Sequence, residues 1–263
     1  PVVSWCPWSD TRGILAGNNC SAHLPSGAID MLILGIETAV EHVGVALGDH
    51  RGTLATATVN SDRRHAESLA PMVEFVCAQA GMSLRQLDAV AVDVGPGLFT
   101  GLRVGIAAAQ SLAWALDVPV VPMCSLDVLA QQATRTEDDV VAAALDARRG
   151  EMYWAVYKPG DGRMVRLTEP VVTPPDDCAI HLAERDQYVT CVGSGFVRHH
   201  DSFEALTRTT MRADEATWPS IDDLLILAGQ KAAREEWVEA HTVEPLYLRV
   251  PDAEINWATR EGR

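Results

Sequence analysis

Hydrophobic and polar positions change their spacing several times along the chain, and each spacing predicts one kind of element. The continuous apolar run MLILGIET (31–38) is typical of a central strand. The runs HVGVALGD (42–49) and LATATVN (54–60) predict two more strands, joined to each other by a tight turn. Residues 68–80 place apolar side chains every three to four positions, which predicts a helix that Gly81 ends. We expect Ser68 to cap this helix and Pro71 to lie in its first turn.

Strands and helices then alternate. LDAVAVDV (87–94) predicts a strand, and residues 102–116 predict a helix that is apolar or small on nearly every side and is therefore buried on several sides. VPVVPM (118–123) and VVAAALDA (140–147) predict two further strands. Between them the pattern predicts a short helix with Ser125 as its cap.

Three strands joined by tight turns and followed by helical crossovers describe the ribonuclease-H-like unit, which actin and the sugar kinases share. The element order therefore predicts an α/β protein with the actin-like ATPase (ribonuclease-H-like) fold and two α/β subdomains. We expect the first subdomain over residues 31–134 and the second over residues 135–263. The second should hold a largely antiparallel sheet of its own, covered by helices that include one over residues 221–237.

The first thirty residues differ from the rest of the chain. They have neither a helical nor a strand period, and their longest apolar run is far shorter than the roughly 7–15 residues of a signal-peptide core. At Met31 the pattern changes at once to a strand. We therefore expect residues 1–30 to be a poorly ordered N-terminal extension, and the folded unit to start at Met31.

Composition and charge narrow the function. Of the 263 residues 48% are hydrophobic, and the formal net charge is −15. An acidic surface repels phosphate backbones, so binding of DNA or RNA by this chain unaided is disfavoured. No apolar run reaches the roughly 18 residues of a membrane span. The six cysteines form no CxxC pair and no zinc or disulfide spacing, which favours a reducing, cytoplasmic location.

The most distinctive stretch is GPGLFTGLRVG (95–105), between a strand and a helix. Backbone N–H groups at such a glycine turn can bind an anion, helped by the helix dipole. The spacing of Gly95, Gly97 and Gly101 matches neither the dinucleotide fingerprint nor the Walker A motif. The alternative is structural: glycine permits the sharp turn and a close helix, with Thr100 as the helix cap. The pattern alone leaves both interpretations open.

Two other places could hold functional side chains. In actin-like proteins the first hairpin presents an acidic residue and a hydroxyl residue to the phosphates and magnesium of a nucleotide, and here Glu37 and Thr38 occupy that bend. In DARRGEMY (146–153), Arg148 and Arg149 follow Asp146 and could bind an anion or an acidic partner, or form a solvated hairpin tip. No metal ligands or catalytic residues are singled out, because no histidine has a partner at ligand spacing.

In their order and separations, several segments resemble the TsaB (YeaZ) family over essentially all of residues 31–263. These segments are MLILGIETA, RRHAESLAP, GPGLFTGLRVG, DARRGEMY and EPLYLR. The resemblance implies an actin-like paralogue of TsaD, the catalytic subunit that places the threonylcarbamoyl group on the adenosine next to the anticodon of certain tRNAs. It implies a non-catalytic scaffold or activating subunit that pairs with TsaD and with the small ATPase TsaE, and that forms homodimers when alone.

The resemblance also shapes the expected chemistry. TsaD-like proteins hold their metal with a His-x-x-x-His helix, whereas here His65 is followed by Leu69, so this chain is not expected to perform the transfer itself. The family more often has Asp and Ser where Glu37 and Thr38 stand, and Ser where Leu98 stands, which weakens any nucleotide binding through these loops. No intrinsic cofactor is expected, and the interface of the complex is the one place left for ATP or ADP. Contact with tRNA should come mainly through the complex, with no role in DNA binding or at a membrane.

These arguments give two sets of candidate residues. The partner or anion-binding candidates are Glu37, Thr38, Gly95, Gly97, Thr100, Gly101, Arg103, Asp146, Arg148 and Arg149. The helices over residues 68–81 and 102–116 are expected to face TsaD or a second copy, and their candidates are Leu69, Met72, Val73, Val76, Ile106 and Ala109. With the family in view, the glycine loop is expected chiefly to seat its helix beside the partner face. The rival hypotheses are a free-standing ATPase or kinase that uses Glu37, residues 95–101 and Asp146 around a magnesium nucleotide, and a metal-dependent peptidase.

Overall fold

The strands expected from the apolar runs form the first of two β-sheets in the computed structural model, which describes residues 31–60, 65–133, 140–160, 163–212 and 216–249. The first sheet has the order β3-β2-β1-β4-β5. Its strands are β1 (Ile33–Glu37), β2 (His42–Asp49), β3 (Gly52–Asn60), β4 (Ala89–Asp93) and β5 (Val120–Met123). The pairs β1–β2 and β2–β3 are antiparallel, whereas β1–β4 and β4–β5 are parallel. The predicted extension, residues 1–30, lies outside the described residues.

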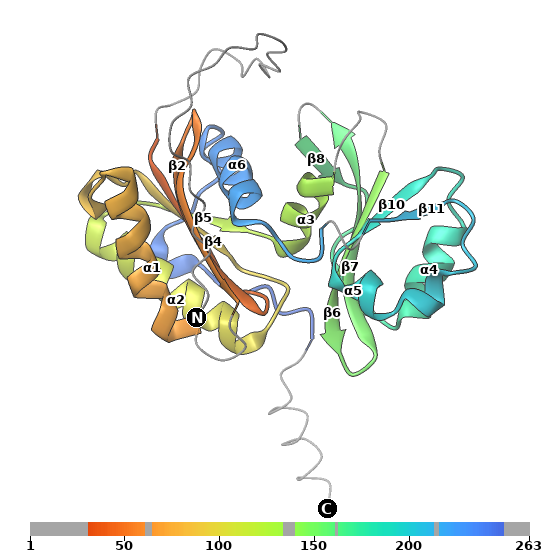
Figure 1. The fold of residues 1–263 in the computed structure, drawn as a ribbon. Helices are drawn as coiled ribbons and strands as arrows, with labels where there is room; N and C mark the ends of the chain where they lie inside the picture. Colours follow the sequence, from red (N-terminus) through yellow and green to blue (C-terminus); the bar gives the residue numbers. More distant parts are fainter. Residues whose placement is uncertain (1–30, 61–64, 134–139, 161–162, 213–215, 250–263) are drawn as a thin grey trace, which may run out of the picture.

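Helices cover both faces of this sheet (Figure 1). Helices α1 (His65–Ala80) and α2 (Phe99–Leu116) pack on the face that includes Leu34 and Ile36 of β1. Side chains alternate along a strand, so Ile33 points to the opposite face, where α6 (Ile221–Ala232) packs. Burial on both faces explains why the central strands are continuous apolar runs.

The start of α1 differs from the prediction, whereas its end agrees with it. The helix already includes His65, so Ser68 lies inside it instead of capping it, and Pro71 lies in its second turn. At the other end Gly81 has a positive φ of 66°, and Met82 N donates to Cys77 O at 3.0 Å. This left-handed glycine ends the helix as the sequence predicted.

A second sheet repeats the topology of the first. Its order is β11-β10-β6-β7-β8, and a short strand, β9 (Val171–Thr173), pairs with β7. The strands on the main path are β6 (Val140–Arg148), β7 (Glu151–Gly160), β8 (Arg163–Arg166), β10 (Val189–Val192) and β11 (Thr209–Met211). Three antiparallel strands are again followed by two parallel ones. Two sheets with this shared topology define the actin-like ATPase fold, so the predicted fold class is confirmed.

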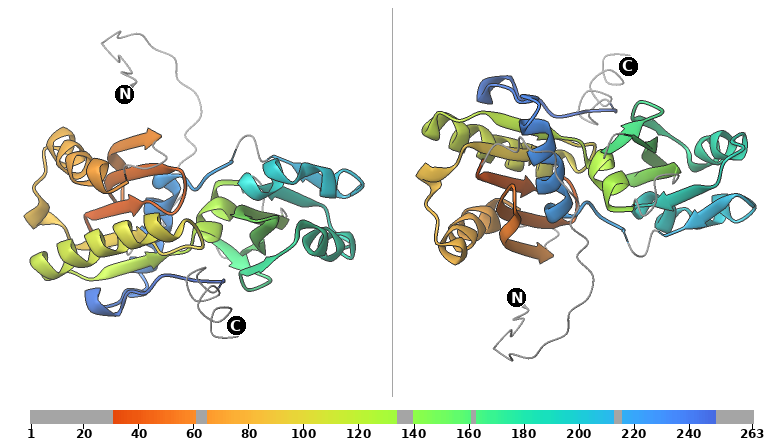
Figure 2. Two further views of the ribbon diagram at one scale, coloured as in Figure 1. Left: turned by 90° about the horizontal axis from the view of Figure 1, so that it is seen from below. Right: turned by 90° about the horizontal axis from the view of Figure 1, so that it is seen from above.

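The remaining elements join and cover the two sheets. They are α3 (Ser125–Ala133), α4 (Pro175–Ala183), α5 (Ser194–Arg198) and the short 3-10 helices η1 (Leu84–Gln86), η2 (His200–Phe203) and η3 (Ala240–Thr242). Helices α3 and α6 lie between the two sheets, as Figure 1 and the view from above in Figure 2 show. Within the described part of the chain, no helix combines the length and apolarity needed to cross a bilayer.

The predicted range of the second subdomain is wrong at its C-terminal end. Helix α6 packs on the first sheet and not on the second, since a Cβ at Gly35 would lie 3.0 Å from Leu225 and a Cβ at Gly44 would lie 3.0 Å from Ile221. After α6, Val238 pairs with Val120 at the edge of β5. The chain therefore returns to the first sheet after leaving the second. The helical period of residues 221–232 predicts a helix but does not say which sheet it covers.

This docking leads to a testable difference between two α6 side chains. Leu224 is fully buried against the first sheet, whereas Ile226 is half exposed. We expect Leu224→Ala to lower the free energy of unfolding by about 2–5 kcal/mol, because it leaves a cavity under α6. Ile226→Ala should change it by no more than about 0.5 kcal/mol. Urea denaturation of both variants measures the difference, and equal losses would contradict this placement of α6.

Candidate functional site

The glycine loop packs on the turn between β1 and β2. Leu98 N donates to Ala39 O at 2.7 Å, and Thr38 Oγ1 donates to Gly101 O at 2.8 Å. Each contact joins residues about sixty positions apart in the chain. The two hydrogen bonds therefore fix the start of α2 against the turn.

Three glycines of α2 and its loop make this close approach geometrically feasible. A Cβ at Gly101 would lie 2.0 Å from Thr38 O, and a Cβ at Gly97 would lie 2.2 Å from Ala39 O. One turn further along α2, a Cβ at Gly105 would lie 2.2 Å from Thr38 Oγ1. No side chain fits in these spaces, because real Cβ atoms do not approach other heavy atoms so closely. The side of the loop toward the turn is thus filled by protein backbone, which favours the structural interpretation of the glycines.

The predicted hydroxyl caps have other roles. The N-cap of α2 is Leu98, whose apolar side chain forms no capping hydrogen bond. Thr100 is an exposed residue of the first helical turn. Thr38 is the threonine that contacts this loop. Ser125 Oγ likewise does not cap α3; it lies 2.8 Å from Asp93 Oδ1 and 2.9 Å from Pro96 O. The hydroxyl groups therefore hold the loop in place, and the predictions that Thr100 and Ser125 act as caps are wrong.

Glu37 lies at the carboxyl end of β1, beside Asp93 at the carboxyl end of β4. The parallel register pairs Ile36 with Val92, so the next residue of each strand is one of the two acids. Both side chains are fully buried. Burial, and then the neighbouring Asp93 carboxyl, raise the pKa of Glu37 well above its ordinary value. Burial also raises the pKa of Asp93. The hydrogen bonds that Asp93 accepts from Gly95 N and Ser125 Oγ act in the opposite direction and lower this pKa.

Asp93 was missed by the sequence analysis. It is the one charged residue in the strand AVAVD (89–93), directly before the glycine loop. A carboxylate at the carboxyl end of a parallel strand lies where α/β folds bind ligands, which is the signal that could have singled it out.

The residues at this edge do not fit a nucleotide phosphate with its magnesium. Magnesium in nucleotide sites keeps several water ligands, but neither Glu37 nor Asp93 has any exposed surface. Glu37 Oε1 already accepts a hydrogen bond from Ala39 N at 2.6 Å. The loop amide of Leu98 is likewise bonded to Ala39 O. Among the described residues, the space between the loop and the turn is taken up by the protein's own backbone and side chains.

The arginine hairpin joins the two sheets. Arg148, Arg149 and Gly150 all have positive φ and form the tight turn between β6 and β7, as the hairpin-tip interpretation expects. Arg148 forms an ion pair with Glu41, which lies in the β1–β2 turn of the first sheet. Arg149 is exposed. At least Arg148 thus has a partner within its own chain.

Asp146 lies just before this turn, among basic side chains. Its carboxylate is 3.3 Å from Arg198 Nε and 3.6 Å from His199 Nε2. Its backbone N–H donates to Ser194 Oγ at 3.2 Å. These contacts tie the end of β6 to α5, and Asp146 belongs to the second sheet, whereas Glu37 and Asp93 belong to the first.

The residues predicted to form the partner face point inward. All six are buried in the core against the first sheet: Leu69, Met72, Val73, Val76, Ile106 and Ala109. An apolar repeat of three to four residues marks the side of a helix that faces its own sheet, so the prediction that these side chains contact a partner is wrong. The outer side of the same helices instead exposes Phe75, Phe99 and Trp114, and Trp114 is 84% exposed.

Arg103, predicted as a contact residue, belongs to an exposed cluster at the start of α2. Its guanidinium carbon lies 3.9 Å from the centre of the Phe99 ring, and its Nε donates to Tyr247 Oη at 2.9 Å. The rings of Phe99 and Tyr247 stack with centroids 5.3 Å apart. A cation held over an aromatic face gains about 0.5–1 kcal/mol at an exposed site, so these three side chains support one another.

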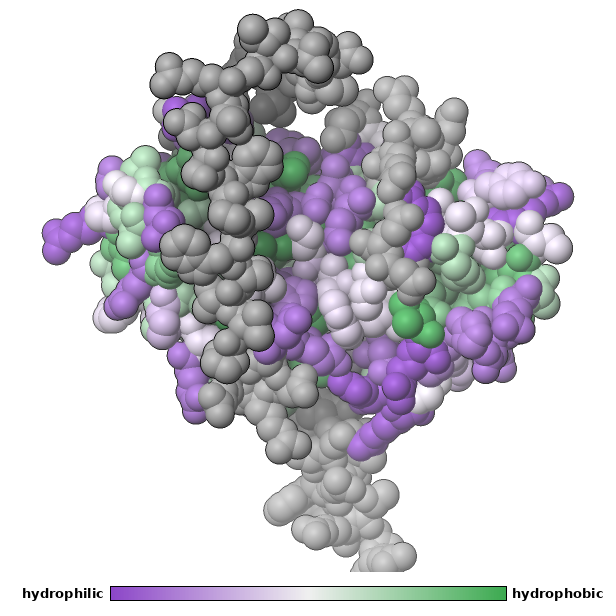
Figure 3. Space-filling model, in the orientation of Figure 1, coloured by the Kyte–Doolittle hydropathy of each residue, from purple (hydrophilic) through white to green (hydrophobic). Residues whose placement is uncertain are grey.

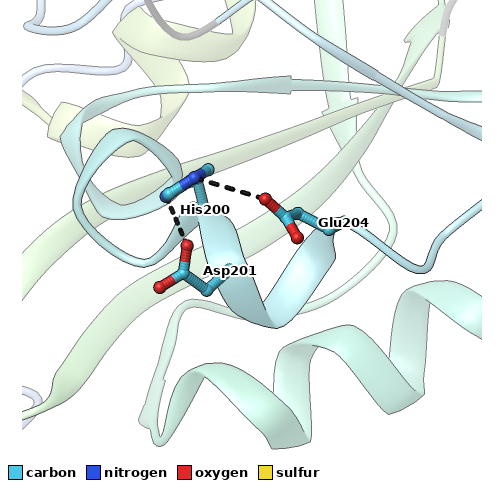
Figure 4. A group of neighbouring side chains, drawn as sticks. All are labelled: His200, Asp201 and Glu204. Carbon is cyan, nitrogen blue, oxygen red and sulfur yellow. Dashed lines mark ion pairs between the residues drawn. The ribbon is translucent and has the colours of Figure 1, made fainter.

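Possible metal ligands gather at a different place, on the surface of the second sheet's layer. Figure 4 shows His200 between the carboxylates of Asp201 and Glu204, all of them exposed. Asp201 lies 3.0 Å from Nδ1 of the ring and Glu204 lies 3.5 Å from Nε2. The two carboxylates face different ring nitrogens, and one possible ligand atom from each of the three residues lies within 4.8 Å of the others. Exposed acidic groups often cluster in this way without an ion, so the cluster alone does not make a metal site.

Fold and site together define the class of the protein: an actin-like ATPase fold whose glycine loop packs directly on the β1–β2 turn. Comparisons with known proteins give the family. The family model described as TsaD, tRNA N6-adenosine threonylcarbamoyltransferase, matches residues 54–257. The tRNA threonylcarbamoyladenosine biosynthesis protein TsaB of Escherichia coli (strain K12) is 35% identical over 226 residues, covering 83% of this chain and 95% of the relative. The chain belongs to the TsaB family.

Further relatives agree. The tRNA threonylcarbamoyladenosine biosynthesis protein TsaB of Haemophilus influenzae is 30% identical over 244 residues, covering 89% of this chain and 99% of the relative. The solved structure of YeaZ from Pseudomonas aeruginosa superposes with a TM-score of 0.75 at 35% identity, and covers 83% of this chain and all of that one. The family resemblance expected from the sequence motifs is confirmed.

Two glycine substitutions test the close contact at the start of α2. Gly101→Ala places a methyl group on Thr38 O, so we expect it to lower the free energy of unfolding by about 1–3 kcal/mol or more. Gly229→Ala in α6 is the matched control, since a Cβ there meets nothing within 4 Å. The control should be neutral or stabilising by up to about 1 kcal/mol, because alanine favours helix. If chemical denaturation shows Gly101→Ala to be as harmless as Gly229→Ala, the backbone contact does not exist in solution.

Proposed function

We propose that this chain is a scaffold and activating subunit in the formation of N6-threonylcarbamoyladenosine in tRNA, and that it does not catalyse the transfer itself. In this proposal it pairs with the catalytic subunit TsaD, and the ATPase TsaE joins that pair. The names of its relatives support the pathway. ATP or ADP, where the complex binds one, belongs at the interface with the partner and not in the closed site of this chain.

The observation that most supports a non-catalytic role is the closed edge of the first sheet. An actin-like enzyme needs its phosphate loop open to a nucleotide, whereas here Gly97 and Gly101 lie on the backbone of the β1–β2 turn. The hairpin acid Glu37 is sealed from solvent. A chain whose site is closed in this way contributes to the reaction by binding other subunits with its surface.

The outer side of α2 is the surface best suited to a partner. Exposed residues recur along it every three or four positions: Phe99, Arg103, Ala107, Ser111 and Trp114. We call this set the α2 stripe. It has aromatic residues at both ends, and the small residues Ala107 and Ser111 lie at and just after its centre, where another helix could approach closely. Elsewhere, hydrophilic residues cover much of the face in Figure 3. A second copy of the chain would use the same stripe when TsaD is absent.

The charge of the chain suits this division of labour. A net charge of −15 gives no electrostatic attraction for tRNA, whose affinity for proteins depends on neutralised phosphates. The basic surface that holds the tRNA therefore belongs to the partner. In this proposal the chain holds TsaD in its active position and stabilises it, and TsaD carries out the transfer.

Reconstitution tests the proposal directly. Purified TsaD and TsaE from the same organism are incubated with unmodified tRNA and the reaction's substrates, with and without this chain, and the modified nucleoside is measured by mass spectrometry. We expect product only when the chain is present. Full activity from TsaD and TsaE alone would overturn the proposed function.

The α2 stripe gives a sharper prediction. Trp114→Ala should weaken binding to TsaD by at least about 30-fold, the size of an interface hot spot, and leave the free energy of unfolding within about 0.5 kcal/mol. Tyr188→Ala is the matched control, since Tyr188 is a 74% exposed aromatic residue next to β10 on the second sheet. Binding can be measured by surface plasmon resonance. The prediction fails if Tyr188→Ala weakens the complex as much as Trp114→Ala does.

A further inference from the structure

Two buried carboxyl groups lie side by side where the parallel strands β1 and β4 end. They are Glu37 and Asp93, neighbours across the parallel pair of strands. Neither has any exposed surface, so water does not satisfy them. Two ionised carboxylates in such a place would repel each other strongly in a medium of low dielectric constant.

Of the four carboxyl oxygens, one on each of the two side chains accepts no hydrogen bond. Glu37 Oε1 accepts from Ala39 N at 2.6 Å. Asp93 Oδ1 accepts from Gly95 N at 2.7 Å and from Ser125 Oγ at 2.8 Å. The other two oxygens, Glu37 Oε2 and Asp93 Oδ2, are buried without a donor. A buried oxygen without a donor is costly, and one proton placed between these two oxygens would satisfy both.

We infer that Glu37 and Asp93 share one proton, carried by Glu37 and donated to Asp93, and that this hydrogen bond closes the phosphate position of the fold from within. The proton takes the place that a cation would occupy between two carboxylates. Together with their backbone partners, the two side chains connect the β1–β2 turn, the glycine loop and the start of α3.

The hydrogen bonds decide which residue holds the proton. Asp93 receives two donors on one oxygen, which favours its ionised form, whereas Glu37 receives one. The pKa of Glu37 is accordingly the one raised well above its ordinary value, by burial and then by the neighbouring Asp93. The other titratable groups that act on Asp93 are Asp127 in the first turn of α3 and the buried thiol of Cys124, and neither adds positive charge. On the far side of the turn, His65 Nε2 contacts Val40 O at 3.0 Å.

A shared proton makes stability depend on pH in a defined direction. The raised pKa of Glu37 means that the folded chain binds a proton that the unfolded chain releases above its ordinary carboxyl pKa of about 4.3. Stability from this pair is therefore fully present below about pH 4.3 and is lost as the pH rises through the folded value. Within that window one extra bound proton changes the unfolding equilibrium constant by up to about tenfold per pH unit.

The variant Glu37→Gln tests this. A glutamine side chain can still accept from Ala39 N, and its amide can donate to Asp93, so the fold is kept while the titrating proton is removed. We expect the unfolding equilibrium constant of the wild-type protein to rise with pH between about 5 and 8 relative to that of Glu37→Gln. Glu74→Gln, at an exposed position on α1, removes an ordinary carboxylate and should keep the wild-type slope. Urea denaturation across this pH range measures all three proteins.

Infrared spectroscopy gives a readout that does not depend on stability. The wild-type protein at neutral pH should show the carbonyl band of a protonated carboxylic acid, which Glu37→Gln loses and Glu74→Gln keeps. In Asp93→Asn the neighbouring charge is gone and the new amide can donate to Glu37, whereas its burial remains, so the acid band should disappear at a lower pH than in the wild-type protein. Equal pH slopes for wild type and Glu37→Gln, together with no acid band, would overturn the inference. So would a rise in wild-type melting temperature on adding magnesium chloride that Glu37→Gln lacks, since it would assign the gap to a cation.

Discussion

The direct contact between the glycines of α2 and the backbone of the β1–β2 turn is the constraint on which the rest of the site depends. With no Cβ at Gly97, Gly101 and Gly105, the start of the helix rests on Thr38 and Ala39. This contact removes the room that a phosphate would need and shuts Glu37 and Asp93 away from water. It also fixes the direction of α2, and with it the position of the exposed α2 stripe. One packing arrangement therefore fills the space between the loop and the turn, and it positions the surface that we propose binds a partner.

The second sheet uses the same device at the matching place. After β10, a Cβ at Gly193 would lie 2.0 Å from Ala144 O of β6, so the chain again passes close to the backbone of the first strand of its sheet. The two halves are then linked by contacts of different kinds. Arg148 at the tip of the β6–β7 hairpin forms an ion pair with Glu41 of the β1–β2 turn, and α3 packs between the sheets. The chain also crosses back, since α6 covers the first sheet.

Most of the fold could be predicted because apolar periodicity reports local geometry. Continuous runs gave the central strands, and a repeat of three to four residues gave α1 and α2. Periodicity does not say which surface an element covers, so α6 was assigned to the wrong sheet. The same limit explains why the predicted partner face was wrong. Val76 and Ile106 fit the apolar repeat but face the core, whereas the exposed Trp114 lies outside that repeat. Asp93 was missed because its importance depends on its being next to Glu37. The two residues are fifty-six positions apart in the chain but lie side by side in the sheet. Only the paired strands bring these two acids together.

The closed phosphate position is the central claim, and a calorimetric titration of the isolated chain with ATP and magnesium at neutral pH tests it most directly. Because the loop already contacts the protein's own backbone, nucleotide binding would require α2 to move off the β1–β2 turn. The predicted result is no saturable heat of binding. Saturable binding of one nucleotide per chain, abolished by substitution of Glu37, would show that the site opens and would contradict the account.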